Sequence, residues 1–149
     1  ELQIDPDKIG VSGTSAGGHL AASVGTLSPQ RPSFMILFYP VISADTDKRH
    51  RGSFEQLLGK KHCDTPQSQE LSLEKKVDVQ TPPTLLFHCD DDKVVPAVNS
   101  VLFYKQLKTY GIKSSLHIYP SGGHGWGMSS CFRYYDDWQK SVLDWLSTL

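Results

Sequence analysis

Three kinds of residue that together carry out acyl transfer follow one another along the chain: a serine, a cluster of aspartates and a histidine. Ser15 is the centre of a G-x-S-x-G pattern over residues 13–17, and His124 lies in the glycine-rich loop 120–127. A serine hydroxyl is a poor nucleophile at neutral pH and needs a base within hydrogen-bond reach. Histidine suits this role, and an acid partner fixes its tautomer and stabilises the imidazolium. The sequence therefore predicts Ser15 as a nucleophile and His124 as its base.

The residues around Ser15 predict a strand before it and a helix after it. Residues 8–12 hold β-branched residues behind the turn at 5–7, and residues 16–26 are rich in alanine. A chain that passes from strand to helix so quickly needs a sharp elbow. We expect the glycines at 13 and 17 to leave room for it, because side chains there would collide with the neighbouring strand and helix. Ser15 then lies at a helix N-terminus, where free N–H groups favour a developing negative charge.

The rest of the chain alternates strands and helices. Apolar runs predict strands over 34–39, 84–88 and 114–119, and helices are expected over 97–110 and 132–147. One helix should bury Phe103, Leu107 and Tyr110, with Gly111 ending it in a left-handed conformation, and the last should bury the stripe Trp138, Val142, Trp145, Leu146 and Leu149. This order predicts an α/β fold with a parallel sheet and helices on both faces. Ser15, the aspartates at 90–92 and His124 each follow a strand, so all should meet at one sheet edge.

Residues 43–80 form the least regular part of the chain. A charged loop at 45–51 precedes a short helix at 53–58, with Ser53 as its expected N-cap, and a second short helix is expected near 72–76. Two interpretations remain open. The segment is either a solvated surface excursion or a lid over a substrate pocket.

Composition excludes several classes of function. The 149 residues include 15 basic and 16 acidic side chains, for a net charge of −1, which gives no reason to expect a nucleic acid or a membrane surface as partner. No apolar run is long enough to span a bilayer. Cys63, Cys89 and Cys131 fit neither a disulfide framework nor a zinc knuckle, and the pairs at 62–63 and 88–89 lack further ligands at metal-binding spacing, so we expect no metal and no cofactor. Because the chain begins at Glu1, we expect it to be the C-terminal part of a longer protein, and its compartment stays open.

The motifs taken together resemble the α/β-hydrolase superfamily, and more narrowly the bacterial esterases and lipases related to acetyl-xylan esterases. The resemblance spans the chain except for 43–80. It rests on D-P-D-K-I-G-V at 5–11, G-T-S-A-G-G-H-L-A at 13–21, P-P at 82–83, D-K-V-V-P at 92–96, N-S at 99–100, H-I-Y at 117–119 and G-G-H-G at 122–125. The chain order of nucleophile, acid and base is also that of the superfamily. The implied fold is the C-terminal half of an α/β-hydrolase domain, here residues 1–149.

The resemblance implies a role for individual residues. Ser15 would be the nucleophile, His124 the base and acid, and Asp92 the triad acid, with Asp91 as the alternative; the unused aspartates would be solvated or cap the next helix. The N–H of Ala16 would be one oxyanion donor. Trp126 either flanks an acyl or sugar pocket or packs under the last helix, and His19 is expected only to pack.

The implied function is a serine hydrolase of the carboxylesterase type that cleaves esters, with short acyl groups on carbohydrates as substrates. Two alternatives stay open: an oligopeptidase of the same fold, and a half-domain that assembles but does not catalyse. The superfamily takes its second oxyanion donor from an H-G-G-type loop near the N-terminus, and this sequence has no such loop. We therefore expect weak activity and self-association through the first strand.

Overall fold

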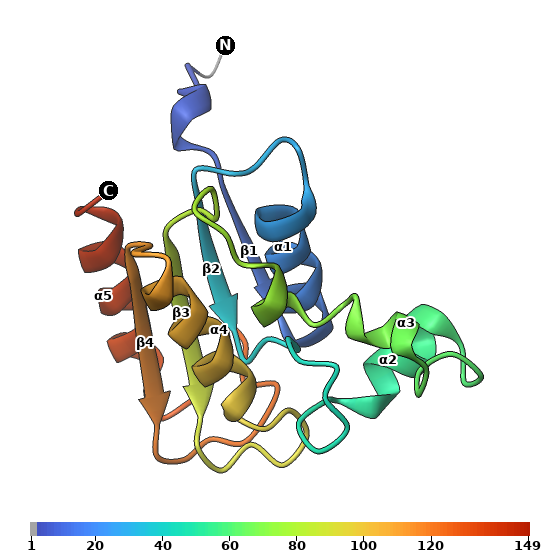
Figure 1. Ribbon diagram of the computed structural model, residues 1–149. Helices are drawn as coiled ribbons and strands as arrows, with labels where there is room; N and C mark the ends of the chain where they lie inside the picture. The colour runs from blue at the N-terminus through green and yellow to red at the C-terminus, as the bar shows by residue number, and fades with distance from the viewer. Residues whose placement is uncertain (1–2) are drawn as a thin grey trace.

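Four parallel strands form one sheet across the part of the chain that the structure, a computed structural model, describes (residues 3–149). The first two residues of the expected 1–149 domain lie outside this range. The strands are adjacent in chain order (Figure 1), namely β1 (Gly10–Thr14), β2 (Phe34–Phe38), β3 (Thr84–Cys89) and β4 (Ser114–Tyr119). In the register, Ile36 pairs with Ser12 and Leu85, and Leu85 pairs with Ser115. The predicted parallel sheet is confirmed.

Helices cover both faces of this sheet, as predicted. Helices α1 (Ser15–Leu27) and α4 (Val98–Thr109) pack on one face, where Leu37 and Leu86 meet Phe103 in a common core. Helix α5 (Tyr135–Leu146) packs on the other, and its Trp138 and Trp145 share a second core with the strands. Burial on both faces explains the unbroken apolar runs in β2 and β3. Two residues that were expected to be buried on helix faces are not: Tyr110 and Leu149 are half-exposed, because each lies past the end of its helix.

Two elements begin two or three residues later than expected: α5 starts at Tyr135 and not at 132, and the first strand starts at Gly10 and not at residue 8. A 3-10 turn, η1 (Pro6–Lys8), occupies part of the segment expected as strand, so β1 begins two residues late. Asp5 caps this turn by accepting a hydrogen bond from Asp7 N–H, which holds the backbone out of extended conformation. Gly111 has φ 70°, the left-handed conformation predicted for it.

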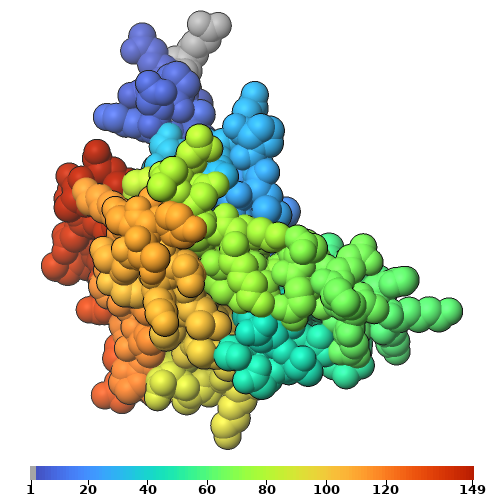
Figure 2. All heavy atoms as spheres, viewed as in Figure 1, coloured from blue at the N-terminus to red at the C-terminus, as the bar shows by residue number. Residues whose placement is uncertain are grey.

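The excursion (residues 43–80) has more structure than its sequence suggests. It contains α2 (Arg51–Leu58), α3 (Pro66–Gln69) and a 3-10 turn, η2 (Leu73–Lys76), of which α3 was not expected. Its Phe54 and Cys63 are buried in a small core that they share with Val41 and Val95 from outside the segment. The N-cap of α2 is His50 and not Ser53, since the His50 ring accepts the Ser53 N–H. Figure 2 shows the segment with α2 and α3 projecting from the side of the body.

Strand β1 lies at one edge of the sheet among the described residues. Unpaired backbone groups on such an edge favour pairing with another chain. Self-association through β1 therefore stays a prediction, to be measured by light scattering. Within residues 3–149, no helix has the length and apolar character needed to cross a membrane.

Candidate active site

The turn from β1 into α1 is the predicted elbow, with Ser15 at its apex. Ser15 has φ 53°, a left-handed conformation that costs a residue other than glycine about 1–3 kcal/mol. Gly13 is required, because a Cβ there would lie 2.2 Å from Gly17 O. The expected reason for Gly17 is wrong, since a Cβ there would meet nothing within 4 Å. Gly18 is the second crowded position, where a Cβ would lie 2.7 Å from Pro40 Cβ.

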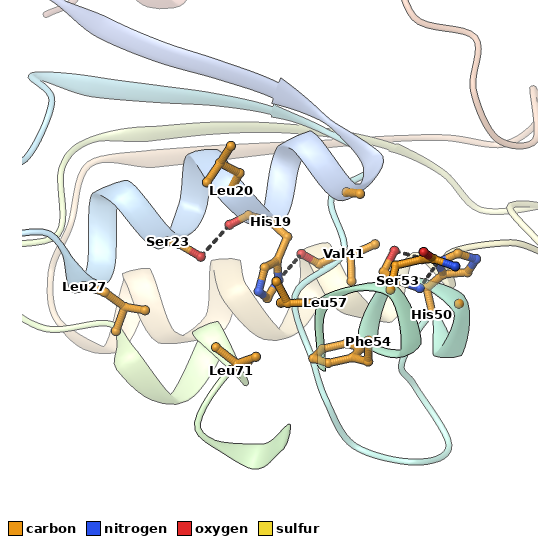
Figure 3. Close-up of a pocket in the computed structure, with 13 residues that line it drawn as sticks. His19, Leu20, Ser23, Leu27, Val41, His50, Ser53, Phe54, Leu57 and Leu71 are labelled. Atoms are coloured by element: carbon orange, nitrogen blue, oxygen red, sulfur yellow. Dashed lines mark hydrogen bonds between the residues drawn. The ribbon is translucent and has the colours of Figure 1, made fainter. Parts of the chain in front are cut away.

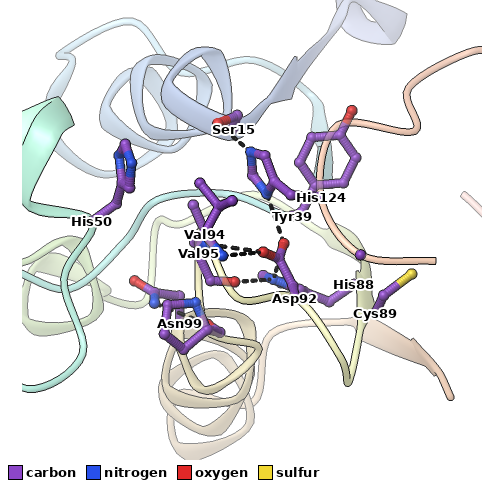
Figure 4. Close-up of polar contacts among 12 residues, drawn as sticks. Ser15, Tyr39, His50, His88, Cys89, Asp92, Val94, Val95, Asn99 and His124 are labelled. Atoms are coloured by element: carbon purple, nitrogen blue, oxygen red, sulfur yellow. Dashed lines mark hydrogen bonds and ion pairs between the residues drawn. The ribbon is translucent and has the colours of Figure 1, made fainter. Parts of the chain in front are cut away.

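At the carboxyl end of the sheet, His124 lies between Ser15 and Asp92 and is within hydrogen-bond distance of both (Figure 4). Ser15 Oγ is 2.9 Å from His124 Nε2, and His124 Nδ1 is 2.6 Å from Asp92 Oδ2. Because a carboxylate only accepts, His124 Nδ1 carries the proton and Nε2 is free to accept from the serine hydroxyl. The Asp92 side chain is 0% exposed and that of His124 16%. This arrangement can activate a hydroxyl and hold the imidazolium that results.

The three neighbouring aspartates have different surroundings. Asp92 is the one against His124, and its Oδ1 accepts the N–H groups of Val94 and Val95, each at 2.9 Å. Asp91 accepts from Gly122 N–H at 3.2 Å and Gly123 N–H at 2.8 Å, and the Gly123 bond is the main cause that lowers its pKa. Asp91 is exposed to solvent, one of the two alternatives expected for an unused aspartate, and it does not cap α4. It holds the loop that carries His124.

Ala16 is the first residue after Ser15 and lies in the first turn of α1. N–H groups in the first turn of a helix have no intrahelical acceptor. The Ala16 N–H is therefore available to an oxyanion formed at Ser15, in the position that the sequence analysis assigned to it.

Tyr39 and His88 contact this site and were given no role in it from the sequence. Tyr39 has φ 36°, its ring lies 4.8 Å from that of His124, and its hydroxyl accepts the Gly127 N–H at 2.8 Å. His88 lies 3.3 Å from Asp92 through its Nε2. The available signals were weak: Tyr39 only ends an apolar run, and His88 is a single imidazole in one, four residues before Asp92.

A groove of about 720 Å³ starts beside Ala16 and runs between α1 and α2. Figure 3 shows Leu20 and Leu27 along one wall and Leu57 on the other. His19 lies beneath it, with Nδ1 3.1 Å from Val41 O and its ring edge-on to Phe54. Burial lowers the pKa of His19. The excursion therefore forms one wall of a groove next to the elbow, and a lid function for it remains a prediction.

Trp126 lies in the aromatic core between the sheet and α5. Its ring stacks on Phe132 at 4.1 Å and meets Phe38 edge-on. It is absent from the walls of the groove beside Ala16, and it lines a smaller cavity of about 360 Å³ with Phe132. This position agrees with the interpretation that Trp126 packs under the last helix, and it gives no support to a role in a substrate pocket.

The described residues contain no group of three or more histidine, cysteine or acidic side chains placed to hold a metal ion. Cys63, Cys89 and Cys131 are free thiols. Burial raises the pKa of Cys89 to about 11, so this thiol stays protonated at neutral pH.

Comparisons with known proteins place this chain among hydrolases. The model of the prolyl oligopeptidase family matches residues 1–149. An acetylxylan esterase from Xylanibacter ruminicola is 39% identical over 98% of this chain, which spans 32% of that relative's length. Endo-1,4-beta-xylanase B from Butyrivibrio fibrisolvens is 35% identical over 84% of this chain, which spans 21% of its length. The solved acetyl ester-xyloside bifunctional hydrolase from Caldicellulosiruptor lactoaceticus matches with a TM-score of 0.90 and 41% identity, over 99% of this chain and 58% of its own.

Proposed function

The chain belongs to the prolyl oligopeptidase family of α/β-hydrolases, and from that premise we propose that it carries the catalytic triad of a serine esterase. Ser15 is the nucleophile, His124 the base and acid, and Asp92 the acid partner. The observation that carries the proposal is the unbroken series of contacts from Ser15 Oγ through His124 to Asp92, at 2.9 and 2.6 Å. Such a series at a strained strand-to-helix elbow is the arrangement that acyl transfer requires.

The reaction follows from these contacts. Ser15 Oγ attacks the ester carbonyl carbon while its proton passes to His124 Nε2, and Asp92 stabilises the imidazolium. The carbonyl oxygen becomes an oxyanion and accepts the Ala16 N–H. When the intermediate collapses, His124 gives its proton to the departing alcohol oxygen and Ser15 keeps the acyl group. Water then attacks the acyl-serine in the same way, and the acid and the free serine are regenerated.

The substrate class we propose is short acyl esters on carbohydrates. The support is the named activity of two relatives, an acetylxylan esterase and an acetyl ester-xyloside hydrolase, at 39% and 41% identity. Amide hydrolysis is the second candidate, favoured by the family match itself. Amides need the leaving nitrogen to be protonated in the transition state, so the same His124 would serve both reactions.

The test combines turnover with covalent labelling. The chain is assayed on an acetylated xylo-oligosaccharide, on 4-nitrophenyl acetate and octanoate, and on a proline-containing peptide anilide. We expect acetyl release and fluorophosphonate labelling at Ser15. Ser15→Ala should abolish this turnover, since loss of the attacking residue costs on the order of 10⁶-fold in a comparable triad, whereas Thr109→Ala, an exposed hydroxyl on α4, should leave it unchanged. Cleavage of the anilide alone would replace the esterase with a peptidase, and turnover that survives Ser15→Ala would remove the mechanism.

A further inference from the structure

Two imidazoles approach the same carboxylate oxygen. His124 Nδ1 is 2.6 Å from Asp92 Oδ2 on the side of the site, and His88 Nε2 is 3.3 Å from the same atom on the side of the core. Figure 4 shows Asp92 between the two rings. The proposed reaction uses only His124. His88, on β3, has a side chain that is 0% exposed, so it cannot reach a substrate.

The contacts of His88 fix its tautomer. Its Nε2 faces two groups that only accept, Val95 O at 2.8 Å and Asp92 Oδ2, so the ring proton is on Nε2. Its Nδ1 is 2.8 Å from Ser100 Oγ on α4, and this nitrogen accepts a hydrogen bond from the Ser100 hydroxyl. Burial is the main cause that lowers the pKa of His88, against the opposite effect of Val95 O and Asp92. The ring is therefore a neutral donor, held from both sides.

His88 also ties together the turn that presents the acid. In this acid turn (residues 89–96), Asp92 Oδ1 accepts the N–H groups of Val94 and Val95, while Oδ2 faces the two histidines. His88 Nε2 lies against two points of the turn, the Asp92 carboxylate in its middle and the Val95 carbonyl near its end. Rotation of the carboxylate away from His124 would break the contact with His88. The orientation of Asp92 is thus fixed by groups that take no part in the reaction.

We propose that His88 is a positioning residue for the Ser15–His124–Asp92 triad, with Ser100 as the hydroxyl that holds its ring from the other side. This deepens the proposed function and rests on it. His88 holds Asp92 Oδ2 in line with His124 Nδ1, and it directs a second N–H at this oxygen of a carboxylate whose side chain is 0% exposed. A buried histidine that merely fills the core needs no contact with the acid, and an apolar side chain of its size would serve as well there.

The experiment compares two side chains of equal length that differ in their donor. Gln in place of His88 puts an amide N–H close to the position of Nε2, whereas Met puts a thioether there. We expect H88M to lower kcat by about 10- to 100-fold with KM nearly unchanged, and H88Q to restore most of the loss. The proton NMR signal of His124 Nδ1–H, at low field, should persist in H88Q and shift or broaden in H88M. Leu107→Ala, which opens the core on α4, should lower the melting temperature and leave kcat unchanged.

The outcomes separate the two proposals. If H88M and H88Q lose stability equally and keep the parent kcat, His88 is a core residue and the positioning role is refuted. Should H88M fail to fold, Ser100→Ala removes only the hydroxyl that donates to His88 Nδ1 and holds the ring, and we expect a fall of several-fold in kcat with KM unchanged; parent kcat in Ser100→Ala would then refute the role. If no ester is turned over at all, or turnover survives Ser15→Ala, the proposed function fails, and the NMR signal of His124 still decides whether His88 orients Asp92.

Discussion

The acid turn and the excursion lie side by side and are held by opposite kinds of contact. At the acid turn, Asp92 is buried with His88 and Ser100 from the flanking β3 and α4; the neutral His88 ring is 2.8 Å from Ser100 Oγ and 3.3 Å from Asp92. The excursion is covered with ion pairs on its surface, among them Arg51–Glu55, Lys75–Asp45 and Lys76–Glu70. Exposed pairs contribute about 0–1 kcal/mol each and weaken with salt, whereas buried bonds are screened much less. The contacts that aim the acid are therefore insulated from the solvent, whereas the surface ion pairs of the excursion are not.

One buried side chain joins the two regions. Asn99 Oδ1 accepts Ile42 N–H at 3.0 Å and Ser43 N–H at 2.9 Å, at the start of the excursion. Its Nδ2 donates to Lys48 O at 2.9 Å and to Pro96 O, at the end of the acid turn, at 3.0 Å. Every hydrogen-bonding position of the amide is used. The excursion is thus attached to the site by a contact of the buried kind.

The largest expected effect on activity comes from a substitution in the acid turn. We expect Asp92→Asn to lower kcat about 10⁴-fold, because an amide no longer holds the productive tautomer of His124. Asp91→Asn should stay within about tenfold of the parent, since it weakens only the bonds to Gly122 and Gly123. Ester hydrolysis rates at matched folded fraction, checked by circular dichroism, measure both. A greater loss in Asp91→Asn would mean that the acid has been assigned to the wrong carboxylate.

A smaller effect is expected at the link between the regions. Asn99→Ala leaves the buried N–H groups of Ile42 and Ser43 without their acceptor, at about 1–3 kcal/mol for each unsatisfied group. We expect the free energy of unfolding in urea to fall by about 2–4 kcal/mol. Val101→Ala, at an exposed position of the same helix, should change it by less than about 0.5 kcal/mol. Equal values for the two variants would show that the excursion is held by its surface contacts after all.

The smallest effect is the pH dependence of a surface pair at the end of the excursion. The Arg31 guanidinium lowers the pKa of Asp78 from 3.8 to about 2. Because the folded pKa lies below the unfolded one, the pair stabilises the fold above about pH 4, and this contribution is lost as the pH falls from 4 through 2. The Asp78 side chain is 43% exposed, so solvent screening limits the contribution to less than about 1 kcal/mol.

The check is the difference in unfolding free energy between the parent and Asp78→Asn, measured from pH 6 to pH 2. We expect a small positive difference at pH 6 that shrinks to zero near pH 2. A difference that grows as the pH falls would reverse the sign derived from the pKa.

Local features of the sequence were enough to predict the elements and two of the three site residues. The pattern around Ser15 and the glycine-rich loop around His124 are short-range signals, because the elbow and the loop are built from neighbouring residues. The alternation of apolar strand segments with helices can also be read from neighbouring residues, and this alternation predicted the parallel sheet. Element ends were less certain, as at β1, where the cap at Asp5 replaced the expected start of the strand.

Only the tertiary structure decided which side chains face one another. The D-K-V-V-P motif at 92–96 favoured Asp92 and left Asp91 as the alternative, because one step along a turn changes the direction of the carboxylate; in the structure Asp92 is the one that faces His124. Position 18 requires glycine and position 17 does not, because Pro40 packs against the side of α1 that Gly18 occupies. Asn99 lies more than 50 residues from Ile42, Ser43 and Lys48, which it binds, and His88 meets Asp92, Val95 and Ser100 only because the chain turns back after β3. Their contacts exist because folding buries them together in places where every polar atom needs a partner.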